Sequence, residues 1–229
     1  MPLTVWFRAM HVITRTKHGI SSMELSRQLG VSVNAAWRIQ PKLMQVMHER
    51  ERDGKHKLGD RGGQIQMDDA YLGGERNGGK RGRGAAGKTP FIAAVETDEE
   101  GRPQRALLQR VVGFRKTEVE KLRMRAILPG CEVVSDGLSC FDALPAPGQV
   151  THLPIKTGGG RKSAQREEFF WVNTVLANVK NNVLGMYRAV RPKHVPRYLS
   201  QFQWRFNRRF DLKNIHRRLV YAAARTPPI

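Results

Sequence analysis

The sequence has few cysteines, few acidic residues and no long apolar run. Of its 229 residues only Cys131 and Cys140 are cysteines, too few for a disulfide framework or a four-ligand zinc site. No apolar stretch approaches the roughly 18 residues that a membrane span needs, and no basic-then-apolar signal opens the chain. These absences exclude a membrane protein and a secreted disulfide-rich module, and we expect an intracellular, reducing compartment.

The shortage of acidic residues leaves a large positive charge. The chain has 40 Lys and Arg against 20 Asp and Glu, a formal net charge of +20. Residues 188–225 hold eleven of the basic side chains and a single acid, Asp211. An excess of this size indicates a polyanionic partner, most simply nucleic acid. Composition does not separate a passive DNA binder from a DNA-processing enzyme.

Residues 1–50 are predicted to be helical and to contain a helix-turn-helix. Ser21 and Glu24 form a capping-box pattern, Gly30 ends the helix that follows, and a third helix starts near Ser32. If the helix that starts near Ser32 enters the major groove, the DNA contacts come from Ser32, Asn34 and Arg38. Trp37 and Ile39 are then structural. An ordinary helical hairpin is the alternative. Pro41 is expected to kink or split the third helix.

A charged, glycine-containing linker is expected over 51–63. After this linker the apolar residues no longer recur only at helical spacing. Residues 64–190 alternate between strand and helix patterns, in the order of three strands, helix, strand, short helix, strand and long helix. This order predicts an α/β domain with a mixed sheet and flanking helices. Residues 191–229 form a basic, helical C-terminal segment.

A loop rich in glycine, lysine and arginine lies within 73–90. Residues 82–89 match the P-loop spacing G-x-x-x-x-G-K-T. The P-loop mechanism needs a helix after the loop, and a strand pattern follows here instead, so nucleotide hydrolysis is disfavoured. We expect a basic loop near DNA, with contacts from Lys80, Arg81 and Arg83.

Two isolated carboxylates are associated with strands of the predicted sheet. Asp68 sits in the first strand and Asp136 closes the strand 131–135, an arrangement that suits a hard divalent cation. On the long helix from Glu167, Asn173 and Lys180 are seven residues apart, so they share one face about 10 Å apart along the axis. A turn-capping Asp and a solvated helix face are the alternative interpretations of these residues.

The C-terminal segment interleaves aromatic and basic residues. Phe202, Phe206 and Phe210 recur every four residues and are expected to be core contacts. The arginines between them are expected to face DNA phosphate; they are Arg205, Arg208 and Arg209.

Together these motifs resemble those of a bacterial insertion-sequence transposase of the DDE superfamily, in its ISXO2-like branch. The matching segments are D-D-A-Y-L-G-G at 68–74, S-D-G at 135–137, Asn173 with Lys180 and G-M-Y at 185–187, and F-Q-W-R-F-N-R-R at 202–209. The resemblance covers nearly the whole chain. Members commonly carry a zinc-binding segment before the helix-turn-helix, and we expect this copy to lack it.

The resemblance implies a ribonuclease H-like fold and metal-dependent DNA cleavage and strand transfer. Two Mg²⁺ (or Mn²⁺) ions would be held by Asp68, Asp136 and Asn173, and Lys180 would hold DNA phosphate. Glu167 or Glu168 is the alternative source of a further ligand, although neither shares the helix face of Asn173, because five or six residues is not a whole number of turns.

The implied partners are transposon inverted-repeat ends and target DNA, bound by a homo-oligomer in the bacterial cytoplasm at the nucleoid. The alternative function is a repurposed, non-catalytic copy that only binds DNA.

Overall fold

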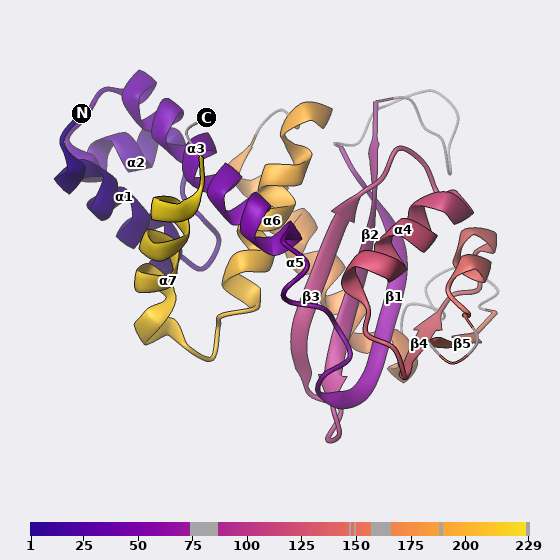
Figure 1. Cartoon of the computed structure of the whole chain (residues 1–229). Coiled ribbons are helices and arrows are strands. Elements are labelled where there is room, and N and C mark those ends of the chain that lie inside the picture. Colours follow the sequence, from indigo (N-terminus) through magenta and orange to yellow (C-terminus); the bar gives the residue numbers. More distant parts are fainter. Residues whose placement is uncertain (74–86, 147, 149, 157–165, 188–189, 228–229) are drawn as a thin grey trace. The chain divides into compact units, whose positions relative to one another are not determined.

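The computed structural model divides the chain into two compact units (Figure 1). It describes residues 1–73, 87–146, 148, 150–156, 166–187 and 190–227. The helical unit comprises Met1–Asp53 and Asn181–Ile229, and the sheet unit comprises Gly54–Lys180. This grouping differs from the four segments expected from the sequence, since 191–229 belongs with the N-terminal helices. None of the described helices is long and apolar enough to cross a membrane.

The helical unit is built from two stretches of chain that share one core. Its helices are α1 (Leu3–Arg15), α2 (Ser22–Leu29), α3 (Val33–Arg52), the end of α5 (Phe170–Met186), α6 (Val195–Phe206) and α7 (Leu212–Arg225). Apolar side chains of α1, α2 and α3 pack with Trp204 of α6 and with Ile215 and Leu219 of α7. Burial of this apolar surface is the main stabilising contribution to the unit.

Helices α2 and α3 form the expected helix-turn-helix pair. The Ser21 side chain caps α2 by accepting from the Glu24 N–H, and Ser32 caps α3 by accepting from the Ala35 N–H. Gly30 has a φ of 66° and ends α2 in the left-handed conformation that glycine favours. Helix α3 is not split at Pro41, because apolar residues on both sides of the proline are buried in the shared core.

The sheet unit contains a five-stranded mixed sheet in the order β3-β2-β1-β4-β5. The strands are β1 (Gly62–Leu72), β2 (Thr89–Asp98), β3 (Pro103–Arg110), β4 (Cys131–Ser135) and β5 (Val150–Pro154). β2 is antiparallel to β1 and β3, whereas β4 is parallel to β1 and β5. This order and these directions are those of a ribonuclease H-like sheet, so the expected fold class is confirmed.

Helices cover both faces of the sheet (Figure 1). On one face, α4 (Lys116–Ala126) and the 3-10 turn η1 (Ser139–Ala143) close a core that includes Ile65, Met67 and Val133. Successive strand residues point to opposite faces, so Gln66 and Asp68 belong to the other face. There the 3-10 turn η3 (Glu167–Phe169) contacts β1 and β4, and α5 begins.

Candidate active site

The strand pairing brings Asp68 and Asp136 together at one end of the parallel pair. Met67 of β1 is opposite Ser135 of β4, so the residue that follows each of them is an aspartate. Val133 belongs to the core beneath α4, and alternation therefore places Asp136, three residues later, on the same face as Asp68.

A third carboxylate, that of Asp69, joins these two. One oxygen from each of Asp68, Asp69 and Asp136 lies within 4.8 Å of the others. Mg²⁺ and Mn²⁺ prefer carboxylate oxygens held in fixed positions, so this donor set fits a hard divalent cation. The sequence pattern did not assign Asp69 to the metal; its place in the D-D pair was the signal that could have done so.

The pKa of the Asp68 carboxyl reflects both its burial and the carboxylates beside it. The pKa of its carboxyl is raised to about 7, first by burial and then by the nearby carboxylates of Asp69 and Asp136. A backbone hydrogen bond from Asp69 and the positive charge of Lys180 act in the opposite direction. Carboxylates packed this closely are stabilised by a bound cation.

The turn after β4 holds Asp136 in a defined orientation. Its Oδ1 accepts a 3.0 Å hydrogen bond from the Leu138 N–H. The Ser135 Oγ accepts from the Gly137 N–H and lies 2.8 Å from Nε2 of His152 on β5. Gly137 has a φ of 75°, which a residue with a side chain rarely adopts. The turn therefore holds the Asp136 carboxylate by one direct hydrogen bond and is itself held by the Ser135 hydroxyl.

Gln66 attaches the start of α5 to the strand that carries Asp68. Its buried Oε1 accepts hydrogen bonds of 2.9 Å from the Trp171 N–H and 3.1 Å from the Val172 N–H. Asn173 is the next residue and is half-buried, and Lys180 is exposed two turns further on. Sequence reasoning missed Gln66, because a polar residue in an alternating strand normally faces solvent.

The glutamates that precede Asn173 lie outside the acidic cluster. Glu167 and Glu168 are in η3 rather than in α5, and Glu168 forms an ion pair with Arg166. Within the described part of the chain, the grouping of acidic residues at the candidate site contains neither of them.

The residues expected to contact DNA fall into three groups. Ser32, Asn34 and Arg38 are exposed near the start of α3. Lys80, Arg81 and Arg83, as well as most of the P-loop-like segment, lie outside the described residues. Thr89 at the end of that segment begins strand β2 and not a helix, which is the wrong local structure for a P-loop.

Two of the three C-terminal arginines are structural. Arg205 and Arg208 are each only 8% exposed. Arg205 donates to the Thr16 carbonyl, and burial lowers its pKa to about 10. Arg208 is paired with the buried carboxylate of Glu51 and stacks on the Trp204 ring. Burial of both guanidinium groups argues against the expectation that they contact DNA phosphate, and the assignment of Arg205 and Arg208 to DNA stays an untested prediction.

Arg209 is half-buried rather than fully enclosed. Its guanidinium stacks on the rings of Phe206 and Phe210, and burial lowers its pKa to about 10. Phe210 is 74% exposed and is not the core residue that its spacing predicted. The assignment of Arg209 to DNA remains a prediction.

Comparison with known proteins identifies the family. The family model for the ISXO2-like transposase domain matches residues 61–207, which is more than half of the chain. The chain belongs to the ISXO2-like transposase family. The matched region contains Asp68, Asp69 and Asp136 as well as all of α5, so the acidic cluster lies inside the transposase domain.

Other comparisons found only distant similarity. A comparison with curated proteins gave no match. The chain is similar to the structure of a pre-cleavage Mos1 transpososome, with 10% identity, a TM-score of 0.30 and coverage of 94% of this chain and 77% of that one. The Mos1 strand transfer complex gives 11% identity, a TM-score of 0.32 and coverage of 95% and 77%. These similarities are too low to bear on mechanism.

Proposed function

We propose that this transposase-family chain binds transposon ends and catalyses metal-dependent DNA cleavage and strand transfer. The observation that carries the proposal is the convergence of Asp68, Asp69 and Asp136 inside the transposase domain. Three carboxylates whose oxygens lie within 4.8 Å of one another repel DNA phosphate unless a cation lies between them, so this cluster favours a metal-dependent enzyme over a passive DNA-binding protein.

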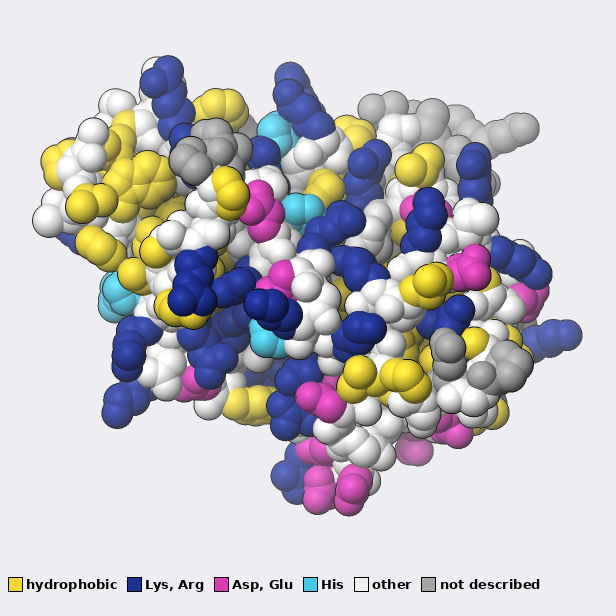
Figure 2. Space-filling view, in the orientation of Figure 1, with side chains coloured by type: hydrophobic (Ala, Val, Ile, Leu, Met, Phe, Trp, Pro, Cys, Tyr) yellow, Lys and Arg dark blue, Asp and Glu magenta, His cyan; other side chains and the backbone are white. Residues whose placement is uncertain are grey.

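The DNA-binding part of the proposal rests on charge and on the helical unit. The net charge is +20, and α2 and α3 form a helix-turn-helix with Asn34 and Arg38 exposed on its second helix. On the face in Figure 2, Lys and Arg side chains are spread over both units, whereas acidic side chains are fewer, with one group of them at the lower end of the sheet unit. Such a distribution favours binding along a phosphate backbone.

The metal would be held by Asp68, Asp69 and Asp136, with the amide oxygen of Asn173 as a further ligand. When bound, Mg²⁺ or Mn²⁺ stabilises the charge that develops on the phosphate and on the leaving oxygen. Because the Asn173 amide is neutral, Asp68 and Asp136 alone would supply too little negative charge to hold two divalent ions. The carboxylate of Asp69 adds the missing negative charge. The number of ions, two in our proposal, is testable by titration.

The other residues of the site bind DNA or hold the metal ligands in position. Lys180 is exposed and its charge acts on Asp68, so it is placed to hold a DNA phosphate as a point charge. Gln66 and the turn at Gly137 position Asn173 and Asp136. In-line attack at phosphorus by a water or a 3′-hydroxyl needs no covalent protein nucleophile.

The test is cleavage and joining of DNA that carries the element's own inverted repeats, with and without Mg²⁺. We expect Asp68→Asn and Asp136→Asn to lose more than the roughly 100-fold typical of outer-shell changes. Asn173→Ala should be inactive, and Asn173→Glu should keep part of the activity. Asp142→Asn is the matched control, since Asp142 is an exposed aspartate of the same unit whose carboxylate pairs with Lys116.

Two results would contradict this assignment. Full activity of Asp68→Asn would remove Asp68 from the chemistry. DNA binding without any binding of Mg²⁺ or Mn²⁺ would instead support a non-catalytic copy. Light scattering of the protein with paired-end DNA tests the expected homo-oligomer.

A further inference from the structure

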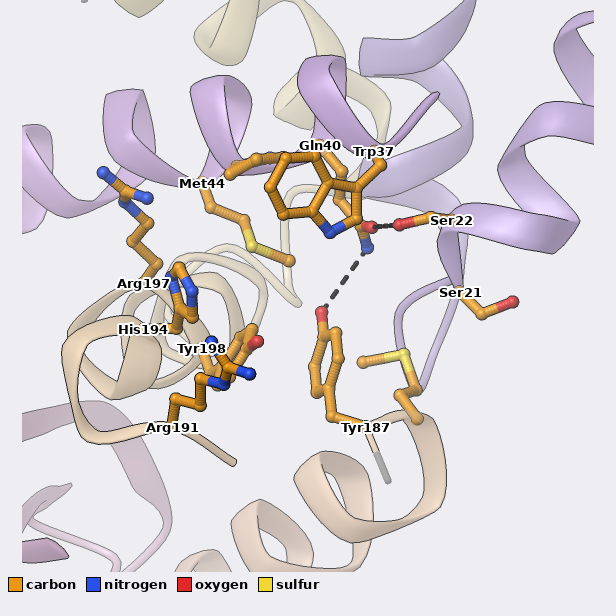
Figure 3. A pocket seen from close by; sticks show the side chains of 12 residues that line it. Ser21, Ser22, Trp37, Gln40, Met44, Tyr187, Arg191, His194, Arg197 and Tyr198 are labelled. Atoms are coloured by element: carbon orange, nitrogen blue, oxygen red, sulfur yellow. Dashed lines mark hydrogen bonds between the residues drawn. The ribbon is translucent and has the colours of Figure 1, made fainter. Parts of the chain in front are cut away.

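A cavity of about 510 Å³ lies in the helical unit between α3 and the segment that connects α5 to α6. Figure 3 shows Trp37 of α3 on one side of this cavity and Tyr187, from the end of α5, on the other. All lining residues belong to the helical unit and are described by the structure. Neither the transposase chemistry nor the helix-turn-helix contacts account for this cavity, whose volume is in the range of small-ligand sites.

The walls of the cavity are aromatic. Trp37 is 59% exposed, although the sequence predicted a structural role for it, so its indole is accessible to a ligand in the cavity. The Tyr187 ring is stacked on the Tyr198 ring, with centroids 4.0 Å apart and an interplanar angle of 21°. Paired tyrosines of this kind form a rigid, flat surface on which another planar group can stack.

The rim of the cavity carries the positive charge of two arginines, Arg191 and Arg197, with His194 beside them. Among its described lining residues there is no carboxylate. The pKa of His194 is lowered by burial and then by the charges of Lys193, Arg197 and Arg191. Arg197 is held by a 2.7 Å hydrogen bond from its Nε to Gln45. The occupant that complements this rim is an anion.

The polar groups inside the cavity are already engaged. Gln40 donates to the Ile20 carbonyl at 2.5 Å and to the Tyr187 hydroxyl at 3.4 Å, and its Oε1 accepts from Ser22 at 2.6 Å. Few donors or acceptors are left to read the edge of a planar ligand. Recognition in this cavity therefore depends on stacking and on charge.

We infer that this cavity binds one unstacked nucleotide of a DNA strand, with the base against Trp37 and Tyr187 and its phosphate at the Arg191 rim. A base inside a duplex has both faces covered by its neighbours, so the strand must be single-stranded, frayed or flipped at that position. Stacking is tolerant of sequence because every base has an aromatic face. The inference rests on the proposed DNA binding and adds a second kind of contact to it.

The experiment uses the full-length protein in EDTA and two labelled hairpin duplexes of one sequence. One duplex carries a single unpaired 2-aminopurine nucleotide, and the other carries an abasic residue at the same position. We expect about tenfold tighter binding of the duplex with the base, together with quenching of 2-aminopurine fluorescence. Trp37→Ala should bring the ratio of the two affinities close to one, and circular dichroism should show an unchanged fold because Trp37 is exposed.

The Arg191→Gln variant distinguishes the contribution of the phosphate contact from that of base stacking. It should weaken binding of both duplexes by a similar factor and lower the salt slope by about one. Tyr221→Ala is the control for an exposed ring of the same unit outside the cavity, and we expect it to keep the wild-type ratio.

The outcomes distinguish this inference from the proposed function. Equal affinity of the wild type for both duplexes, with DNA binding intact, overturns the nucleotide site and leaves the transposase proposal standing. The nucleotide site is also overturned if an acidic peptide displaces the 2-aminopurine duplex as well as an unpaired oligonucleotide does. Failure to bind either duplex overturns both.

Discussion

The Oε1 atom of Gln66 accepts a 2.9 Å hydrogen bond from the backbone N–H of Trp171, and thereby fixes the first turn of α5 on strand β1. Asp68 follows two residues later on the same face of that strand, and Asn173 follows two residues later in the helix. One buried side chain therefore links the strand that carries Asp68 to the helix that carries Asn173 and Lys180.

Gln66→Met should damage catalysis more than DNA binding. The substitution keeps the volume but removes the acceptor from two N–H groups, at a cost of about 1–3 kcal/mol in the free energy of unfolding. Cleavage should fall at least tenfold with little change in DNA affinity, as measured in parallel denaturation, cleavage and anisotropy assays. Gln66→Glu keeps the acceptor but adds a carboxyl group to the face of Asp68, so it should recover stability only at a pH low enough to keep that carboxyl protonated. Gln109→Met, at a half-buried position of β3 where the side chain accepts a hydrogen bond from Arg125, is the control for losing an acceptor away from α5. Equal losses of cleavage in both Met variants would refute the anchoring role.

Removing the charge of Asp68 should have opposite effects on stability with and without metal. In the metal-free protein Asp68→Asn should raise the free energy of unfolding, because it relieves repulsion among three buried or half-buried carboxylates. Mn²⁺ should stabilise the wild type, by about 2.7 kcal/mol at a concentration 100 times the dissociation constant, and should not stabilise the variant. Thermal melts in EDTA and in Mn²⁺ measure both effects. Asp142→Asn should behave as the wild type does, and a Mn²⁺ response in Asp68→Asn would contradict the metal site.

Glu96 should make the sheet unit less stable as the pH rises from acidic toward neutral. This residue of β2 is 0% exposed, and its Oε2 is without a hydrogen-bond partner. Its pKa is raised by burial, against the effect of hydrogen bonds from the Gly59 and Arg61 N–H groups. The folded state therefore binds more protons than the unfolded state between the two pKa values, and stability is lost as the pH rises through that window.

Denaturant titrations of wild type and Glu96→Gln across that pH range test this expectation. The variant keeps the Oε1 acceptor and cannot ionise, so its stability should depend less on pH. Glu120→Gln, at an exposed site on α4, should leave the pH dependence as it is in the wild type. An unchanged profile in Glu96→Gln would show that Glu96 does not titrate in the folded state.

Arginines of the helical unit should separate into structural and DNA-contacting groups. Arg208→Gln leaves the Glu51 carboxylate buried and poorly paired, so it should cost about 3–5 kcal/mol of folding free energy. Arg38→Gln should leave stability unchanged and reduce the salt slope of DNA binding by about one. Denaturation and salt-dependent binding of the two variants form a direct comparison. A reduced salt slope in Arg208→Gln, at a temperature where it is folded, would return Arg208 to the DNA interface.

Local patterns predicted the elements of the fold well, and long-range pairing explains what they missed. β4 has the expected bounds, Cys131–Ser135, because a short apolar run between turn residues leaves few alternatives. Asp69 joins the carboxylate cluster although strand alternation assigns it to the face opposite Asp68. Arg208 looks in the sequence like part of a solvated basic stretch, since Glu51, its partner, is 157 residues away. Such partnerships are decided by tertiary packing, which a local pattern does not contain.

The shared core of the helical unit imposes an order on folding during synthesis. The sheet unit is one continuous stretch, Gly54–Lys180, whereas the helical unit needs Trp204, Ile215 and Leu219 to complete the core around the helix-turn-helix. Domains fold as units while the chain emerges from the ribosome, N-terminal parts first. Here the core around the N-terminal helices is completed only after the last helix has been made, so we expect the nascent chain to form its carboxylate cluster before it forms a stable helical unit.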